Sequence, residues 1–116
     1  MNHDRRKMTK YEKTVLYDKC HGHCAYCGEH ITFQDFQIEH AQPISRGGTD
    51  TYGNQLPACE ACNKAKGYRT LEEFRADLER WPKIIRDSPF YSNAVRFGII
   101  EIKERKIVFY FERVGV

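Results

Sequence analysis

The sequence lacks any long hydrophobic run and any strong excess of charge of one sign. No apolar stretch approaches the roughly 20 residues needed to cross a bilayer, and the polar N-terminus, Met-Asn-His-Asp-Arg-Arg-Lys, is not followed by the apolar segment of a secretory signal. The formal net charge is only +3, so the total charge by itself does not indicate nucleic-acid binding. These features predict a cytoplasmic protein with no membrane partner.

The chain also lacks internal repeats, low-complexity tracts and a clear interdomain linker. Its 116 residues are long enough for one modest core and too short for two independent ones. The hydrophobic fraction of 41%, with 13% aromatic residues, argues against disorder. We therefore expect a single domain over residues 1–116.

Five cysteines in a chain without an export signal favour metal binding over disulfides, because a reducing compartment keeps thiols free. Four of them form two pairs, Cys24-x-x-Cys27 and Cys59-x-x-Cys62. Four thiolates suit tetrahedral Zn²⁺ and leave no open coordination position, so this ion would be structural. The alternative is that the cysteines are simply reduced and buried, as we expect for the fifth, Cys20.

Two capping boxes predict the starts of two helices. Thr9-x-x-Glu12 precedes a helix over about residues 10–20, and Thr70-x-x-Glu73 opens a second helix that Pro82 should end. Apolar residues recur along the second helix at helical spacing and should pack in the core: Leu71, Phe74, Leu78 and Trp81. 

The chain between these helices should hold shorter elements. A short strand is expected to end at Glu39 and His40, and a two-turn helix should open at Pro57 and close at Gly67.

The residue pattern of the C-terminal segment predicts a β-hairpin. Apolar residues at 97–102 and 107–111 flank a charged turn at 103–106. Both faces of this hairpin would carry apolar side chains, so it should be buried on both sides or used at an interface. A homodimer or a protein partner bound through the hairpin is therefore left open.

One stretch of sequence carries the strongest functional signal. Its parts are Gln37-Ile38-Glu39-His40-Ala41-Gln42-Pro43, the Gly47-Gly48 turn, Asn54, and Cys62-Asn63-Lys64-Ala65-Lys66-Gly67 after the second cysteine pair. Together with the first cysteine pair, these motifs resemble the HNH endonuclease family over about forty-five residues. The final His of the family's name is Asn63 here, and its amide oxygen can also bind a hard cation.

The resemblance implies a ββα fold with a metal ion held between a hairpin and a helix. The expected fold class is therefore α+β. It comprises a small zinc-stapled ββα-metal (HNH) core at about residues 20–70, the N-terminal helix at 10–20, and the C-terminal helix with its β-hairpin at about 71–116.

The residues themselves suit phosphodiester hydrolysis. Neutral His40 can accept a proton from water near pH 7 as the general base. Glu39 and Asn63 offer oxygen ligands that suit a catalytic Mg²⁺ or Mn²⁺. The resemblance gives Asn54 a supporting role, bracing the loop that orients His40. Four cationic residues are candidates for binding DNA phosphates: Arg46, Lys64, Lys66 and Arg69.

The predicted function is that of a metal-dependent HNH endonuclease that nicks DNA or cuts both strands, with structural Zn²⁺ and catalytic Mg²⁺ or Mn²⁺. Small proteins of this family type are common in phages and mobile elements, so the expected setting is a bacterial or phage-infected cell. The alternative is a zinc-stabilised DNA- or protein-binding module that keeps the HNH core as a scaffold. A third interpretation is that catalysis serves a larger machine.

Overall fold

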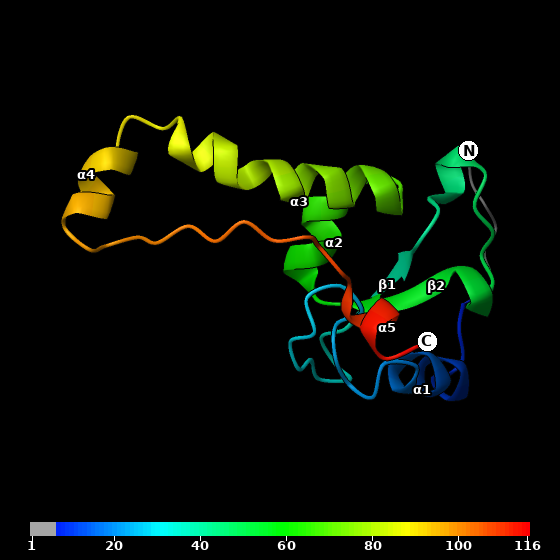
Figure 1. Ribbon diagram of the computed structural model, residues 1–116. Coiled ribbons are helices and arrows are strands. Elements are labelled where there is room, and N and C mark those ends of the chain that lie inside the picture. Colours follow the sequence, from blue (N-terminus) through cyan, green and yellow to red (C-terminus); the bar gives the residue numbers. More distant parts are fainter. Residues whose placement is uncertain (1–6) are drawn as a thin grey trace.

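The computed structural model describes residues 7–116. The polar residues 1–6, considered above for a secretory signal, lie outside this description. The chain forms, in order, α1 (Lys10–Asp18), β1 (Gln37–His40), the 3-10 turns η1 (Ile44–Arg46) and η2 (Tyr52–Asn54), β2 (Gln55–Ala58), α2 (Glu60–Lys66), α3 (Leu71–Arg86), α4 (Tyr91–Arg96) and α5 (Tyr110–Arg113). This mixture of helices with one small sheet confirms the α+β class (Figure 1). None of the described helices is long and apolar enough to cross a membrane.

The N-terminal helix α1 begins where its capping box predicts. The Thr9 hydroxyl accepts from the Glu12 amide at 3.1 Å, and the Glu12 carboxylate accepts from the Thr9 amide at 2.9 Å. These two bonds satisfy amides that the first helical turn leaves without partners. The helix buries Leu16, and Cys20 just beyond it is fully buried in the core, as expected for a small core residue.

The two strands form one antiparallel pair that sets the geometry of the site. In its register His40 pairs with Gln55 and Glu39 pairs with Leu56. Pro57 lies within β2 opposite Ile38, which corrects the expectation that it opens a helix. A two-stranded sheet tolerates this proline because each strand has a free edge where no amide donor is needed. Helix α2 begins instead after Cys59, whose sulfur caps the Cys62 amide at 3.4 Å.

Helix α3 starts at its predicted capping box, and the bond pair between Thr70 and Glu73 is present. Pro82 lies inside this helix and does not end it, contrary to the prediction. The ring fits helical backbone angles and removes one amide donor, a loss that water can compensate on an exposed surface. Phe74 is buried in the core, but Trp81 is about half exposed because the C-terminal part of α3 extends beyond the core.

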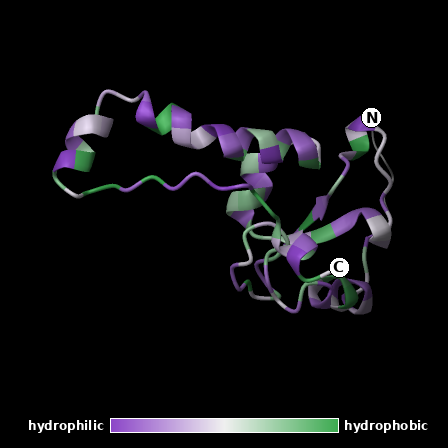
Figure 2. Cartoon of the chain, viewed as in Figure 1, coloured by the Kyte–Doolittle hydropathy of each residue, from purple (hydrophilic) through white to green (hydrophobic). Residues whose placement is uncertain are grey.

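The predicted C-terminal β-hairpin is absent, since residues 97–109 form no strand. Helix α4 ends at Phe97 and Gly98, whose backbone amides donate hydrogen bonds to the carbonyls of Asn93 and Val95. The chain then returns in extended form alongside α3 instead of pairing with itself (Figure 1). Figure 2 shows hydrophobic residues scattered among hydrophilic ones along this arm, defined here as residues 79–106. The expectation of a dimer or partner bound through a hairpin therefore loses its structural basis.

The chain that follows the arm is anchored on the core by aromatic packing. Phe109 is 1% exposed, and its ring centroid lies 5.1 Å from that of Tyr26 and 5.5 Å from that of Phe74. The following amides of Tyr110 and Phe111 donate to the carbonyls of Tyr26 and Ala25 at 3.1 and 2.8 Å. The C-terminal segment thus packs against the loop that carries the first cysteine pair.

Candidate active site

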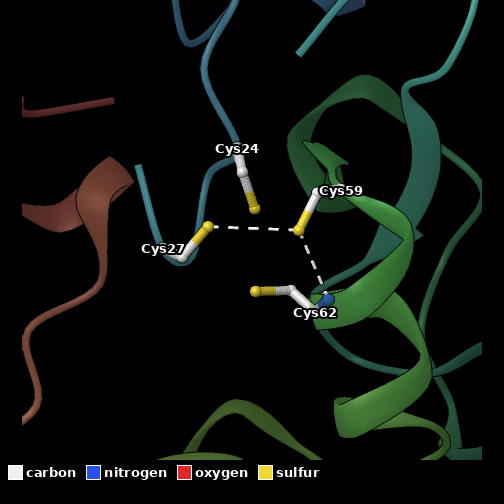
Figure 3. Close-up of side chains that lie close together, drawn as sticks. All are labelled: Cys24, Cys27, Cys59 and Cys62. Atoms are coloured by element: carbon white, nitrogen blue, oxygen red, sulfur yellow. Dashed lines mark hydrogen bonds between the residues drawn. The ribbon is translucent and has the colours of Figure 1, made fainter. Parts of the chain in front are cut away.

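The four paired cysteines converge on one point, as the sequence predicts (Figure 3). The first pair comes from the loop after α1, and the second pair lies at the start of α2. All four sulfur atoms lie within 4.8 Å of one another, and the Cys27 and Cys59 sulfurs are 4.0 Å apart. Zinc–sulfur bonds of about 2.3 Å in a tetrahedron place sulfur atoms about 3.8 Å apart. The cluster therefore has the donor atoms and the size of a structural Zn²⁺ site.

The thiols of this cluster alter one another's pKa. A hydrogen bond from the Cys62 thiol lowers the pKa of Cys24 to about 4, and the same bond raises the pKa of Cys62. Burial raises the pKa of Cys27 to about 11. A bound divalent cation would supply the positive charge that four thiolates require.

Three of the residues predicted for catalysis or metal binding line one cleft. Glu39 and His40 come from the end of β1, and Asn63 comes from α2, which packs beside this strand. The cleft has a volume of about 490 Å³, and its remaining lining comes from the neighbouring loop and the end of α2: Ile38, Pro43, Ile44, Ser45, Gly67 and Tyr68. An acidic residue, a histidine and an amide therefore face a space that can admit part of a substrate.

The fourth residue, Asn54, stands outside this cleft and holds the loop that follows His40. Its amide oxygen accepts from the Gln42 backbone amide at 2.9 Å, while its nitrogen donates to the carbonyls of Gln42 at 2.9 Å and Thr49 at 2.7 Å. Gly48 is required beside it, because a Cβ there would lie 1.8 Å from the Gln42 carbonyl oxygen. These contacts agree with a bracing role for Asn54.

Glu39 is buried, and its charge is balanced from within the protein. Its Oε1 atom accepts a short hydrogen bond from the Tyr26 hydroxyl and lies 3.2 Å from the Lys66 ammonium. Burial and the nearby carboxylate raise the pKa of Tyr26, so the phenol keeps its proton and acts as the donor. The Lys66 nitrogen also donates to the His40 carbonyl at 3.0 Å.

The position of Lys66 corrects one predicted DNA contact. Its side chain is 0% exposed, so its ammonium cannot reach a phosphate on the surface. Lys66 is instead the buried counter-ion of Glu39, because a buried carboxylate needs such a partner. No local pattern in the sequence indicates this pairing or the part that Tyr26 plays in it.

The other three predicted cationic residues are accessible. Lys64 is largely exposed and pairs with Glu60 at 3.1 Å. Arg46 makes two hydrogen bonds to the Glu73 carboxylate, which join the loop after β1 to the start of α3. Arg69 is half exposed and pairs with Asp77 at 2.5 Å. Surface pairs of this kind are weak and can exchange for phosphate oxygens.

A second cation would find suitable donors in the cleft. Glu39 Oε2 receives only a 3.5 Å contact from Lys66, and a carboxylate oxygen has two acceptor positions. The Asn63 nitrogen donates to Gln37 at 3.5 Å, which leaves its amide oxygen for a ligand. These hard oxygen donors match Mg²⁺ or Mn²⁺ better than zinc. The residues therefore fit such an ion.

His40 has a partner that the sequence analysis did not identify. Its Nε2 atom lies 2.7 Å from Asp50 Oδ1, in the loop between the two strands. The two residues are separated by ten positions in a loop of irregular structure, so no periodicity in the sequence brings them together. Only the register of β1 with β2 and the bracing of the loop by Asn54 could have predicted this contact.

Comparison with known proteins gives the class of this domain. The family model described as HNH endonuclease matches residues 24–69. This segment contains both cysteine pairs, both strands and α2. Residues 24–69 therefore match the HNH endonuclease family, which confirms the resemblance seen in the sequence.

Two individual relatives are similar to the chain. The CRISPR-associated endonuclease Cas9 of Corynebacterium diphtheriae is 42% identical over 45 residues, which cover 38% of this chain and 4% of that protein. The type II-C Cas9 enzyme from Actinomyces naeslundii has a crystal structure that matches with a TM-score of 0.52 at 19% identity, over 73% of this chain and 10% of that one. The structural match shows a shared fold. The chain spans only a small part of the length of either relative.

Proposed function

We propose that this chain is a metal-dependent endonuclease that hydrolyses DNA phosphodiester bonds in the cleft between β1 and α2. The observation that carries the proposal is the convergence of Glu39, His40 and Asn63 on one cleft within an HNH domain. The relative from Corynebacterium diphtheriae is itself named an endonuclease, which supports the reaction class. Glu39 and His40 lie in the chain between the two cysteine pairs, and Asn63 directly follows the second pair, so a metal-bound cysteine cluster would brace the site.

His40 acts as the general base in this proposal. It accepts a proton from water as the water oxygen forms a bond to phosphorus and the bond from phosphorus to the leaving oxygen breaks. Its side chain is 13% exposed, so it lines the cleft yet is held in place by its surroundings. Asn54 positions the loop after His40 and does not touch the substrate.

Glu39 and Asn63 would hold Mg²⁺ or Mn²⁺, which when bound supplies positive charge to the phosphate. Glu39 is a fixed ligand because Tyr26 and Lys66 already set its orientation. Zinc in the four-cysteine cluster would have no free coordination position and would serve only the fold.

Arg46, Lys64 and Arg69 would bind phosphates flanking the cleaved bond. Their contacts would be to the backbone and not to base edges, so binding should depend strongly on salt and little on sequence. Supporting evidence comes from their exposure and from their weak surface ion pairs.

The test is a plasmid-nicking assay in Mg²⁺ or Mn²⁺ with the zinc-loaded protein. His40→Ala should reduce cleavage by several orders of magnitude and leave DNA affinity unchanged, because a general base acts in the transition state. The matched control is His30→Ala, which removes an exposed histidine that does not line the cleft.

Parental cleavage by His40→Ala at saturating metal would overturn the proposal. Retained DNA binding without cleavage in the parent protein would favour the alternative of a zinc-stabilised binding module. Binding should be measured by fluorescence anisotropy over a range of salt concentrations, so that both functions are tested with the same preparation.

A further inference from the structure

We propose that Asp50 is a positioning residue that fixes the ring orientation and the tautomer of His40; this inference rests on the function proposed for His40. The two side chains meet at 2.7 Å between His40 Nε2 and Asp50 Oδ1. An ionised carboxylate has no proton to donate, so the imidazole nitrogen that faces it carries the hydrogen. The neutral ring then keeps Nδ1 unprotonated and able to accept a proton.

The fold holds Asp50 in place from a second direction. The side chain of Gln55 donates to the same Oδ1 atom at 3.0 Å. Gln55 is the residue of β2 that pairs with His40 across the sheet, so these two partners of Asp50 lie at one register position. Gln55 is buried, and its carbonyl accepts from the Lys19 ammonium at 2.8 Å. The carboxylate is therefore clamped by two neighbours on a rigid sheet.

The loop adds a further constraint on the position of Asp50. Asn54 donates to the Thr49 carbonyl at 2.7 Å, and the hydroxyls of Thr49 and Thr51 lie 2.8 Å apart. Hydrogen bonds therefore hold Thr49 and Thr51, the residues on both sides of Asp50, in place. Asp50 is 31% exposed, compared with the 66% to 77% exposure of Lys83 and Asp87 in an ordinary surface pair. The pair of His40 and Asp50 is less exposed to solvent, and both side chains are short, so the pair keeps one geometry more readily than a surface pair of long side chains.

Different partners separate this role from that of Glu39. At the end of β1, where both residues line the cleft, the Glu39 carboxylate contacts Tyr26 and Lys66 while the His40 ring contacts Asp50. The two carboxylates therefore do not compete for the imidazole. Each has one task, Glu39 as a ligand donor and Asp50 as the partner of the base.

The first measurement is nitrogen NMR of the His40 ring, at a fixed pH at which the imidazole is neutral. The parent protein should show one tautomer, with the proton on Nε2. Asp50→Ala should show a mixture of the two tautomers or a change to the other one. Asp87→Ala, which removes a carboxylate on the distant arm, should leave the spectrum as in the parent.

The second measurement is the rate of plasmid nicking. Asp50→Ala should lower kcat by roughly 10- to 100-fold, as is typical for partners that orient an active group, with KM and DNA affinity unchanged. Asp50→Asn keeps an acceptor oxygen for Nε2 and should recover part of both the rate and the tautomer. Because it conserves the shape, it also serves as the test if Asp50→Ala fails to fold.

The outcomes distinguish this inference from the proposed function. A His40 spectrum that is the same in the parent, Asp50→Ala and Asp50→Asn overturns the positioning role, even if His40 is essential. A fall in activity that follows only a fall in stability also overturns it. If His40→Ala cleaves normally, the proposed base is wrong, but the NMR comparison still reports whether Asp50 sets the tautomer.

Discussion

The buried pair of Lys66 and Glu39 allows a sharp test of how the site is built. In Lys66→Met the side-chain volume is nearly conserved, so little cavity forms, but the Glu39 carboxylate loses the ammonium at 3.2 Å. Removing one member of a buried ion pair costs about 3–5 kcal/mol. Domains are stable by only about 5–15 kcal/mol in total, so the variant should be close to unfolding.

The free energy of unfolding should be measured by urea titration with zinc present, followed by circular dichroism. The matched control is Lys64→Met, the same change on the same helix at a side chain that is 75% exposed, and its cost should be less than about 1 kcal/mol. Adding Glu39→Gln to Lys66→Met should recover part of the loss, since the unpaired charge is then gone.

Salt dependence of DNA binding separates the two lysines again. Lys64→Met should reduce the slope of log affinity against log salt by about 1, as for the loss of one phosphate contact. Lys66→Met should leave this slope unchanged under conditions where the variant is folded. An unfolding cost below about 1 kcal/mol for Lys66→Met, or a slope reduced as in Lys64→Met, would refute the buried-pair assignment.

Two further predictions concern the metal cluster and acid stability. Cys59→Ser should release zinc and unfold the protein, because it removes one zinc ligand and the sulfur that caps the Cys62 amide. Elemental analysis would measure the zinc content and circular dichroism the folding. A folded variant with one zinc per chain would contradict the prediction. The hydrogen bond from Arg46 lowers the pKa of Glu73 to about 2, from an unfolded value of about 4.5. This contact therefore stabilises the fold fully above pH 4.5, and its contribution to stability is lost as the pH falls toward 2. The stability difference between the parent and Arg46→Gln should therefore shrink over that interval in acid titrations, and a constant difference would show that the ion pair has no part in it.

Features fixed by chemistry close along the chain were predictable from the sequence. Both capping boxes are present because Thr and the Glu three positions later satisfy each other's amides within one turn. The cysteine cluster was also predictable, since each pair is a local motif and four thiolates have one common use. That Glu39, His40 and Asn63 belong to one site was expected from the HNH resemblance, and the three residues line one cleft.

Features that depend on which distant segment is the partner were not predictable. The apolar pattern at 97–111 predicted a β-hairpin, and this was wrong because the pattern does not say which segment of the chain these residues contact. The amide of Ile107 donates to the side chain of Glu79 at 2.7 Å instead of pairing with another strand. Lys66 likewise looked like a surface cation, because its burial arises only when α2 packs on the face of β1 that carries Glu39.

The arm leaves and rejoins the core at nearly the same place, and this affects how the chain length can vary. Glu79 at its start bonds to Ile107 just past its end, and Arg75 donates to the Ile107 carbonyl at 2.7 Å. For a flexible segment between fixed ends, the entropy of closure changes by only about 0.6 kcal/mol for each twofold change in length. The residues between these anchor points can therefore be shortened to a tight connection, or lengthened, with little effect on the cleft. A minimal version of this protein would keep the anchor residues and omit the segment between them.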